Sequence, residues 1–196
     1  MEGGRSASPS RRGRTVQTLD YPLAVLSGAL LTLSFPVIGD PAFAWIALVP
    51  LLLALHGAGA QPHQDFQRAF LIGIVSGVVY FGGTLYWITE VMVTYGGLKR
   101  PVSLAVNGLL VAYLALFPGL FSVAVVAMMM KFGSLALLLA PMVWVTTELG
   151  RMYFLGGFPW ELLGYSQTTV LPVAQLASVF GVHGLSALVA SVSATV

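Results

Sequence analysis

Two things are scarce in this sequence of 196 residues: it contains no cysteine, and only 8% of its residues are charged. The missing cysteine excludes disulfides, thiol nucleophiles and thiolate metal ligands on this chain. An average soluble domain carries about 25% charged residues, whereas here 57% of the residues are hydrophobic and the mean hydropathy is +0.88. The composition therefore excludes an ordinary soluble globule and predicts that most of the chain faces lipid.

Signatures of metal, nucleotide and nucleic-acid binding are missing as well. The histidines His56, His63 and His183 lack metal-ligand spacing, and the sequence has no glycine-rich phosphate loop. The net charge of +2 arises from an arginine run near the N-terminus, which is a poor nucleic-acid footprint. We therefore expect no metal, no cofactor and no nucleic-acid partner.

Residues 1–20 differ in composition from everything that follows. They are rich in Gly, Ser, Pro and Arg and show no apolar periodicity, which predicts a disordered basic tail. The paired Arg11 and Arg12 ahead of an apolar run, with a small-x-small cleavage site at residues 42–44, would also fit an export signal. The membrane-like character of the whole downstream chain favours the tail.

Residues 21–196 are interpreted as one transmembrane helical domain, so the predicted fold class is all-α, a polytopic bundle of about six helices. The apolar segments lie at residues 22–38, 42–55, 69–88, 101–130, 132–149 and from 168 onward. The first two are shorter than the roughly 20 residues that a spanning helix needs, so they form either two thin spans or a helical hairpin in one face of the bilayer. The fourth, with about 45 Å of helix, exceeds a bilayer core of about 30 Å, which predicts tilt or a break at Pro118.

The distribution of lysine and arginine predicts the orientation of the bundle. The basic residues divide into an inside set, Arg5, Arg11, Arg12, Arg14, Arg68 and Lys131, and an outside set, Lys99, Arg100 and Arg151. The larger set lies inside when the N-terminus is cytoplasmic, as the positive-inside rule favours. The loops around residues 90–100 and 150–167 are then external.

The C-terminal end of the sequence lacks the flank typical of a finished membrane protein. No formal charge follows Glu161, and Val196 is reached without the basic or polar residues that usually close a span. We expect the helical domain to be truncated at this end, either naturally or in the gene model.

Ionisable residues inside apolar segments are the first candidates for function, because each costs about 2.5 to 3.5 kcal/mol on insertion scales. Trp144, Glu148 and Arg151 are spaced i, i+4, i+7, which puts an indole, a carboxylate and a guanidinium on one helix face. One interpretation is an ion pair with an interfacial tryptophan anchor, and the other is a site for a lipid head group. Glu90, next to the aromatic pair at residues 86–87, fits an aromatic belt better than a site.

Two other features concern helix contact and lipid contact. Gly73 and Gly77 form a small-xxx-small pair that allows close helix packing, a pattern common in spanning helices. The loop at residues 156–167 is unusually aromatic, since it holds Phe158, Trp160 and Tyr165 among glycines and a proline. It is typical of a loop that re-enters the interface or lines a lipid entrance, and a plain interfacial anchor is the alternative.

The sequence contains an ordered set of short motifs. The two most specific are Gly157-Phe158-Pro159-Trp160 and Leu163-Gly164-Tyr165-Ser166-Gln167. The others are Leu33-Ser34-Phe35-Pro36, the segment Trp45-Ile46-Ala47-Leu48-Val49-Pro50-Leu51, the Trp144, Glu148, Arg151 spacing and Gln175-Leu176-Ala177. Over residues 22–190 this set resembles the membrane portion of bacterial apolipoprotein N-acyltransferases.

The resemblance implies a multi-pass enzyme of the bacterial cytoplasmic (inner) membrane. It would move an acyl chain from a phospholipid donor to the N-terminal amine of a diacylglyceryl lipoprotein, in lipoprotein biosynthesis. In that family a nitrilase-like domain with a Glu, Lys, Cys triad performs the chemistry, and this sequence has neither that domain nor a cysteine. The resemblance therefore implies no catalytic residue here, and the chain alone is expected to be inactive. It does imply a role in holding lipid substrates for Trp144, Glu148, Arg151, Phe158, Trp160, Tyr165 and Gln167.

Two other functions fit the sequence. A non-catalytic membrane module that binds lipid or a partner would need no cysteine. A transporter fragment would use Glu90, Asn107 and Pro118 as a broken-helix pathway, but the sequence lacks the paired half-repeats of such folds.

Overall fold

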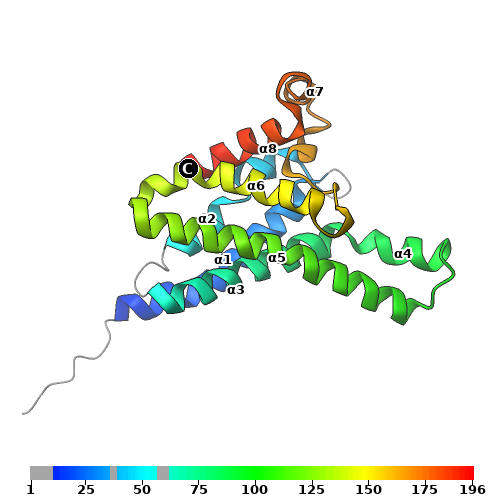
Figure 1. The fold of residues 1–196 in the computed structure, drawn as a ribbon, viewed down its shortest axis with the longest axis horizontal. Coiled ribbons are helices and arrows are strands. Elements are labelled where there is room, and N and C mark those ends of the chain that lie inside the picture. Colours follow the sequence, from blue (N-terminus) through cyan, green and yellow to red (C-terminus); the bar gives the residue numbers. More distant parts are fainter. Residues whose placement is uncertain (1–10, 36–38, 57–61) are drawn as a thin grey trace, which may run out of the picture.

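The computed structural model describes residues 11–35, 39–56 and 62–196, and this part of the chain is helical without strands. The predicted all-α bundle is confirmed. The α-helices shown in Figure 1 are α1 (Arg11–Leu33), α2 (Val49–His56), α3 (Pro62–Thr84), α4 (Tyr86–Thr94), α5 (Arg100–Phe132), α6 (Ala140–Tyr153), α7 (Leu171–Ala174) and α8 (Ala177–Thr195). Short 3-10 helices are η1 (Pro41–Ile46), η2 (Gly133–Leu139), η3 (Phe154–Gly156) and η4 (Leu163–Gln167).

Each predicted apolar segment contains helix. Among the described residues, three helical stretches are long and apolar enough to cross a membrane, at residues 66–84, 100–156 and 177–195, and two shorter apolar stretches cover Leu19–Leu33 and Pro41–His56. The helix α1 begins at Arg11, inside the segment predicted as a disordered tail. Residues 1–10 of that tail and residues 36–38 of the first apolar segment lie outside the described residues.

The contact between α3 and α5 is the largest between two helices, and glycine permits it. A Cβ built on Gly73 would lie 2.2 Å from the Pro118 carbonyl oxygen, and one on Gly77 would lie 2.8 Å from the Ala115 Cα. No side chain fits at those distances, so the small-xxx-small pair brings the two backbones together. At one end of this packing, Arg68 of α3 forms an ion pair with the buried Asp20 of α1.

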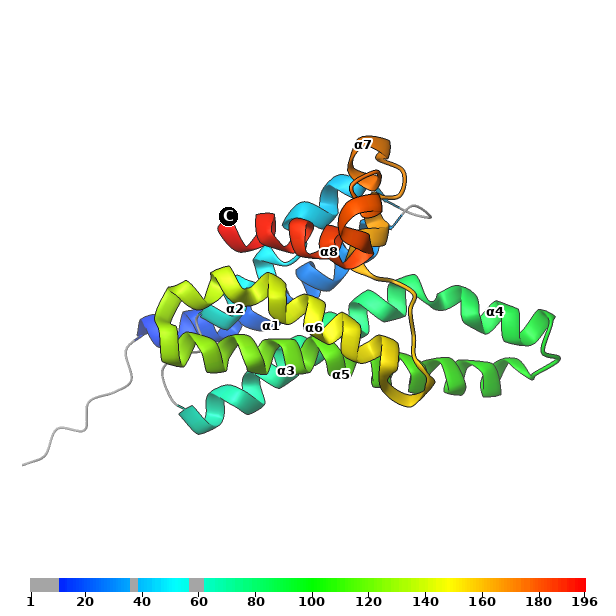
Figure 2. The same cartoon turned by 45° about the horizontal axis from the view of Figure 1, so that its top comes forward.

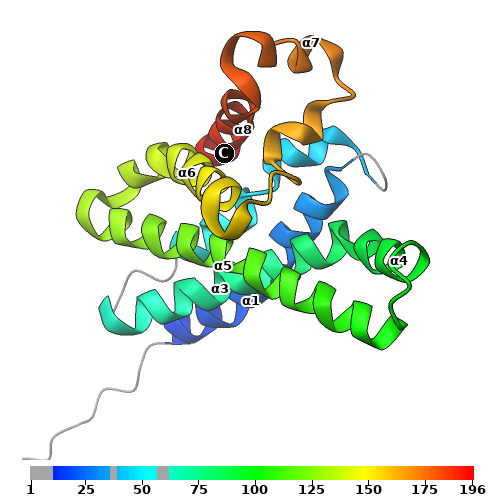
Figure 3. The ribbon, with the colours of Figure 1, turned by 45° about the vertical axis from the view of Figure 1, so that its right-hand side comes forward.

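The helix α5 continues for 33 residues without a break, with Pro118 in its interior. The first half of α5 forms a hairpin with α4, and this hairpin projects beyond the other helices (Figure 1). Figure 3 shows this hairpin standing apart from α6 and α8. An ion pair between Arg100 and Glu90, 2.8 Å apart and exposed to solvent, links its two arms.

A break at Leu85 separates α3 from α4, where the sequence predicts one segment through residue 88. The Asn107 side-chain amide of α5 donates to the Leu85 carbonyl at 3.2 Å and to the Thr89 hydroxyl at 3.1 Å. Leu85, Thr89 and Asn107 are buried, and the Leu85 carbonyl also accepts the Ile88 backbone N–H at 3.1 Å, so the amide adds a side-chain hydrogen bond at the break. Asn107 and Glu90, which a transporter would use as pathway residues, thus have structural partners in the hairpin.

The C-terminal helix closes the bundle. In Figure 2, α6 runs alongside the second half of α5, and α8 lies over α6. The Ser193 hydroxyl of α8 donates to the Trp45 carbonyl of η1 at 2.8 Å. Most of the buried apolar side chains belong to one core that runs through all the long helices, with Leu31, Leu48, Ile72, Leu114 and Phe121 among its fully buried members. The site described next lies where α1, α3 and α6 end, called here the loop end of the bundle.

Candidate functional site

The buried carboxylate of Glu148 ties α6 to the loop that follows it. Its side chain is 3% exposed, and one oxygen, Oε1, accepts two hydrogen bonds. The Trp144 indole N–H, one turn earlier on the same helix face, donates at 2.9 Å. The backbone N–H of Leu163, at the start of η4, donates at 2.7 Å. The loop therefore returns to α6 through a charge-assisted contact.

Arg151 holds the loop from a second direction. The side chain is also 3% exposed, and its Nη2 donates to the Glu161 carbonyl at 2.8 Å. The Tyr80 hydroxyl of α3 donates to the same carbonyl at 2.7 Å. The guanidinium carbon of Arg151 lies 5.0 Å from the centre of the Phe81 ring, within the range of a cation–π contact. One peptide group of the loop is thus fixed by two buried donors from two helices.

This peptide group is held in an unusual conformation. Glu161 has a φ of +58°, in the left-handed region that side chains other than glycine rarely adopt. Such a conformation costs of the order of 1 to 3 kcal/mol and persists where surrounding contacts enforce it. The two hydrogen bonds to its carbonyl supply that enforcement.

Glu148 and Arg151, both described by the structure, do not form the predicted ion pair with each other. Instead, Glu148 Oε2 lies 3.7 Å from His183 Nδ1 of α8. Several buried polar atoms of this cluster have no hydrogen-bond partner in the described part of the chain. They are Glu148 Oε2, Arg151 Nη1, Glu161 Oε2 and His183 Nδ1. Buried polar atoms normally find partners, so these four atoms hold hydrogen-bonding capacity that the described residues do not use.

Little space is left beneath the cluster. The cavity lined by Trp144, Glu148, Arg151 and the neighbouring aromatic residues has a volume of about 10 Å³. Such a volume holds at most about one water molecule. Trp144, Glu148 and Arg151 are therefore inside the fold, supporting the loop, and not on a surface that a whole lipid could reach.

Aromatic side chains form the outer surface of the loop. Phe158 is buried, and its ring meets Trp160 edge to face with the centroids 5.2 Å apart. Trp87 at the start of α4 approaches Trp160 in the same manner, at 6.4 Å. Trp160 is 55% exposed and Tyr165 is 38% exposed, so these two residues present aromatic surface to the surroundings. Gln167 is buried, and its amide donates to the Pro41 carbonyl at 3.0 Å.

The environment of Glu161 alters its acidity. Burial raises the pKa of its carboxyl from 4.5 to about 7, and the nearby Arg151 guanidinium offsets part of that rise. Glu161 is also one of the residues that line a cavity of about 160 Å³ at the ends of α1 and α3 and the start of α4. Among the described residues, no three His, Asp or Glu side chains come together as a metal site.

Four of the seven predicted site residues, Phe158, Trp160, Tyr165 and Gln167, belong to the loop at residues 156–167, and the other three, Trp144, Glu148 and Arg151, lie on α6. Five of the seven are buried, whereas Trp160 and Tyr165 are exposed. Gln167 anchors the end of the loop to η1. Sequence reasoning missed Tyr80, Phe81, Glu161 and His183. Tyr80 and Phe81 look like ordinary residues of an apolar span. Glu161 carried a signal, since it is the one acid of the aromatic loop at residues 156–167.

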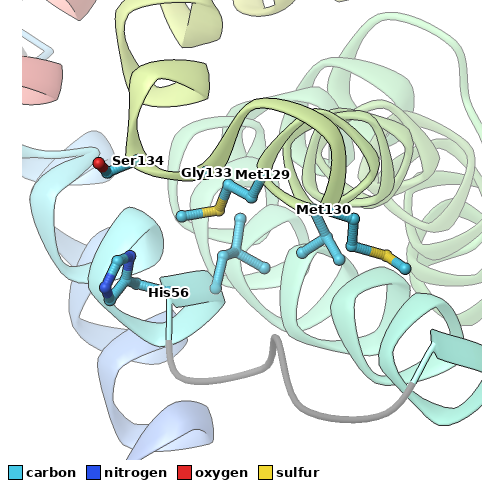
Figure 4. Close-up of a pocket in the computed structure, with 7 residues that line it drawn as sticks. His56, Met129, Met130, Gly133 and Ser134 are labelled. Carbon is cyan, nitrogen blue, oxygen red and sulfur yellow. The ribbon is translucent and has the colours of Figure 1, made fainter.

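A second cavity of about 160 Å³ lies at the opposite end of the bundle, near the turn from α5 into η2 (Figure 4). His56 and Ser134 lie on one side of it, and the Met129 side chain extends toward them while Met130 extends away. These side chains do not converge on a common point. The cavity is therefore an apolar recess with a polar rim and carries none of the predicted site residues.

Comparison with known proteins identifies the family. Residues 27–195 match the model of the apolipoprotein N-acyltransferase N-terminal domain. The chain belongs to this family. The resemblance that the sequence motifs indicate is therefore confirmed, and the GFPW loop and the Glu148 cluster lie within the matched region.

Relatives in this family are much longer than the chain. It is 47% identical over 175 residues to the apolipoprotein N-acyltransferase of Geobacter metallireducens, an alignment covering 87% of this chain and 32% of that protein. It is 34% identical over 182 residues to the one from Shewanella oneidensis, covering 91% and 34%. A third, from Methylococcus capsulatus, is 36% identical over 174 residues, covering 86% and 32%. The chain thus spans about a third of the length of these relatives.

Proposed function

We propose that this chain is the membrane part of an apolipoprotein N-acyltransferase and that it holds the lipid substrates. The reaction moves an acyl chain from a phospholipid to the N-terminal amine of a diacylglyceryl lipoprotein. The family membership and the names of the relatives support this proposal. Since the 196 residues include no cysteine, a thiol-based acyl intermediate cannot form on them. The role assigned to the chain is therefore substrate holding, in the bacterial cytoplasmic membrane with the N-terminus inside.

The observation that carries the proposal is the fixed position of the aromatic loop. Tyr80 and Arg151 hold the Glu161 carbonyl, and Glu148 holds the Leu163 amide, so the loop is anchored on both sides of residue 162. Trp160, immediately before this anchored segment, remains half exposed. A loop that served only as a connector would not need buried charged residues to fix it, because each buried charge is costly.

The proposal divides the site residues by position. Trp160 and Tyr165 are exposed and would contact lipid directly, as amphipathic rings do at head-group depth. The buried residues would act through them as positioning residues. This second group consists of Trp144, Glu148, Arg151, Phe158 and Gln167.

Polar contacts, more than apolar ones, would determine which lipids the chain prefers. Moving an acyl chain from water into an apolar environment is worth about 0.8 kcal/mol per CH₂, but a chain that is already in the bilayer gains far less from contact with protein. The discrimination between lipids must then come from groups at head-group depth. The loop end supplies these groups, whereas the cavity near His56 supplies apolar surface.

Lipid binding by tryptophan variants tests the proposal. The chain is purified in detergent, and its affinity for a phospholipid and for a diacylated lipopeptide is measured by native mass spectrometry. We expect Trp160→Ala to weaken binding by about tenfold, as loss of an exposed aromatic contact residue does. Tyr95→Ala is the matched control, because Tyr95 is an aromatic residue that is 85% exposed at the hairpin tip. Equal affinities for all three proteins would contradict the proposal.

A non-catalytic module that binds lipid or a partner is the second candidate, because the absence of cysteine suits it equally well. The two candidates differ in what happens after binding. Expression of the intact gene in cells that depend on lipoprotein N-acylation separates them, with mass spectrometry of a reporter lipoprotein as the readout. N-acylated reporter supports the acyltransferase, and bound lipid without N-acylation supports the module.

A further inference from the structure

The start of α8 bends at a glycine, and His183 lies two residues beyond the bend. Gly181 has a φ of +67° and a ψ of 176°, so its backbone is not helical although it lies within α8. The short helix α7 and the first turn of α8 before this glycine are called here the α7–α8 corner, residues 168–181. Figures 1 and 3 show α7 at a distance from α3 and α5. Val179 and Phe180 in the corner are exposed, and such sparse cover predicts that the corner opens more readily than the core.

His183 faces the one oxygen of Glu148 that the aromatic loop does not use. Glu148 Oε1 accepts from Trp144 and Leu163, whereas Oε2 lies 3.7 Å from His183 Nδ1. Both Oε2 and Nδ1 are buried and have no hydrogen-bond partner among the described residues. A separation of 3.7 Å is longer than a hydrogen bond, which spans about 2.7 to 3.2 Å. A shift of less than about 1 Å would therefore complete the contact.

The same face of α8 already contacts the aromatic loop. Ser186 lies one turn after His183, and its buried hydroxyl oxygen accepts the Gly164 backbone N–H at 2.9 Å. Gly164 directly follows Leu163, whose N–H donates to Glu148. The helices α6 and α8 thus hold neighbouring peptide groups at the start of η4. A contact between His183 and Glu148 would join these two helices directly at the point where both hold the loop.

Few ionisable side chains surround this pair. The elements that pack against α8 are α2, α6, α7, η1, η2 and η4, and the sequences of α7, η1 and η2 contain no ionisable residue. The other three elements carry Glu148, Arg151 and Tyr153 on α6, Tyr165 on η4 and His56 on α2. Tyrosine ionises at about pH 10, and arginine keeps its charge throughout the neutral range. His56 lines a cavity together with Ser193 and Val196, at the opposite end of α8 from His183.

One further group near the pair titrates close to neutrality. The aromatic loop adds Glu161, whose carboxyl has a pKa of about 7. Arg151 donates to the Glu161 carbonyl and not to Glu148. His183 is therefore the side chain that can bring a positive charge to Glu148 Oε2, and histidine ordinarily gains that charge between about pH 5 and 8. Attraction between opposite charges is stronger in such a buried position than at a surface.

We propose that His183 is a positioning residue whose protonation orders the site: the imidazolium Nδ1–H donates to Glu148 Oε2 and fixes the α7–α8 corner and η4 against α6. The proton comes from solvent, which reaches the ring because the side chain is 26% exposed. An imidazolium donates from both nitrogens, so Nδ1 becomes a donor whichever tautomer the neutral ring has. The consequence for lipid rests on the proposed function: the loop that holds lipid is better ordered in mildly acidic than in mildly basic medium.

Hydrogen exchange at two pH values tests the contact. The purified chain in detergent is compared at pH 5.5 and pH 7.5, and each rate is divided by the chemical exchange rate of an unstructured peptide at that pH. We expect residues 168–181 to exchange about fivefold more slowly at pH 5.5, because a charge-assisted hydrogen bond then holds the corner. Equal corrected rates at the two pH values would overturn the proposal.

Variants assign the effect to one side chain. His183→Gln cannot gain a proton, so its corrected rates in the corner should differ by less than about twofold between the two pH values. His56→Gln is the matched control and should keep the fivefold difference, because His56 lies at the opposite end of α8. A fivefold difference that persists in His183→Gln would assign it to Glu161 and overturn the role of His183.

A second substitution at the same position keeps the test decisive if His183→Gln does not elute as a folded monodisperse protein. His183→Asn places a neutral amide near the position of Nδ1 and cannot change its charge. Its corrected rates should also differ by less than about twofold between pH 5.5 and pH 7.5. A larger difference in this variant would overturn the role of His183 in the same way.

Lipid affinity separates this inference from the function on which it rests. Binding of short-chain phosphatidylglycerol in detergent is measured at the same two pH values for the unmodified chain and for His183→Gln. We expect about threefold tighter binding at pH 5.5 for the unmodified chain alone, since an ordered site loses less freedom on binding. An equal change in both proteins overturns the link between His183 and lipid. No binding at either pH, with the exchange difference intact, overturns lipid holding and supports the contact of His183 with Glu148.

Discussion

Tyr80 and Arg151, which lie on different helices and 71 positions apart in the sequence, donate to the same carbonyl oxygen, that of Glu161. The distances are 2.7 and 2.8 Å. This shared acceptor connects α3, α6 and the aromatic loop at one atom. The position of Trp160 therefore depends on how α3 and α6 pack.

Tyr80→Phe should loosen the loop without unfolding the bundle. The carbonyl loses one of its two donors, which corresponds to about 1 kcal/mol for a buried hydrogen bond. Hydrogen exchange of residues 160–164 in detergent should accelerate roughly fivefold. Tyr113→Phe provides the control, because the Tyr113 hydroxyl donates to the Phe154 carbonyl at an exposed position. Unchanged exchange in Tyr80→Phe would show that Arg151 alone fixes the loop.

The stability of the chain should depend on pH through Glu161. The folded pKa of about 7 lies above the unfolded value of 4.5. Below pH 4.5 both states hold the proton, and between 4.5 and 7 the unfolded state releases it first, so stability falls as pH rises and levels off above 7. The loss should reach about 2 to 3 kcal/mol.

Thermal unfolding in detergent across this pH range measures the effect. Glu161→Gln should remove the part of the slope that Glu161 causes, whereas Glu90→Gln should retain it. A slope of the same size in Glu161→Gln would assign the pH dependence to another group.

Gly77→Ala should destabilise the α3 to α5 contact. The added Cβ would lie 2.8 Å from the Ala115 Cα, so the helices must separate, at a cost of about 1 to 3 kcal/mol for overpacking. Gly108→Ala in α5 is the matched control, since its Cβ meets nothing within 4 Å and alanine favours helix by about 1 kcal/mol. Melting temperatures in detergent should fall for Gly77→Ala and hold or rise for Gly108→Ala. The opposite order would mean that α3 and α5 do not pack this closely.

Asn107→Leu should disturb the start of α4. The substitution removes the amide donor from the buried Thr89 hydroxyl and from the Leu85 carbonyl, which keeps the Ile88 backbone N–H, at a cost of about 1 to 3 kcal/mol. Hydrogen exchange should rise in residues 86–94. Glu90→Gln, which weakens an exposed ion pair, should change stability by less than about 1 kcal/mol. Protection of α4 equal to that of the unmodified chain would show that the break at Leu85 needs no side-chain support.

The sequence predicted the fold through local signals. Apolar runs located the long helices, and the spacing of Gly73 and Gly77 allowed for the close helix contact that these two glycines make with α5. The break at Leu85 was missed because the residue that supports it, Asn107, is 22 positions away on another helix. The long run at residues 101–130 did contain one helix, and α5 continues through Pro118, so the predicted break there is wrong, while a tilt of the helix in the bilayer stays a prediction.

For the site, sequence spacing identified the right helix face and the wrong partners. Trp144, Glu148 and Arg151 do share a face, and this could be predicted from helix periodicity. Spacing alone also suggested an ion pair, whereas Glu148 accepts from Trp144 and Leu163, and Arg151 donates to Glu161. Hydrogen bonds to a loop depend on how the chain folds back onto the helix. The periodicity of residues within one helix gives no information about that.

The length of α5 gives the molecule an uneven profile across a membrane. The apolar stretches of α3 and α8 have 19 residues each, about 28 Å of helix, which matches a hydrocarbon layer of about 30 Å. With 33 residues, or about 50 Å, α5 is longer by about 20 Å. That excess, together with α4, forms the hairpin that projects beyond the other helices in Figure 1, with Tyr95 and Leu98 near its tip. The bundle is therefore longer on the side of this hairpin than on the side of α8.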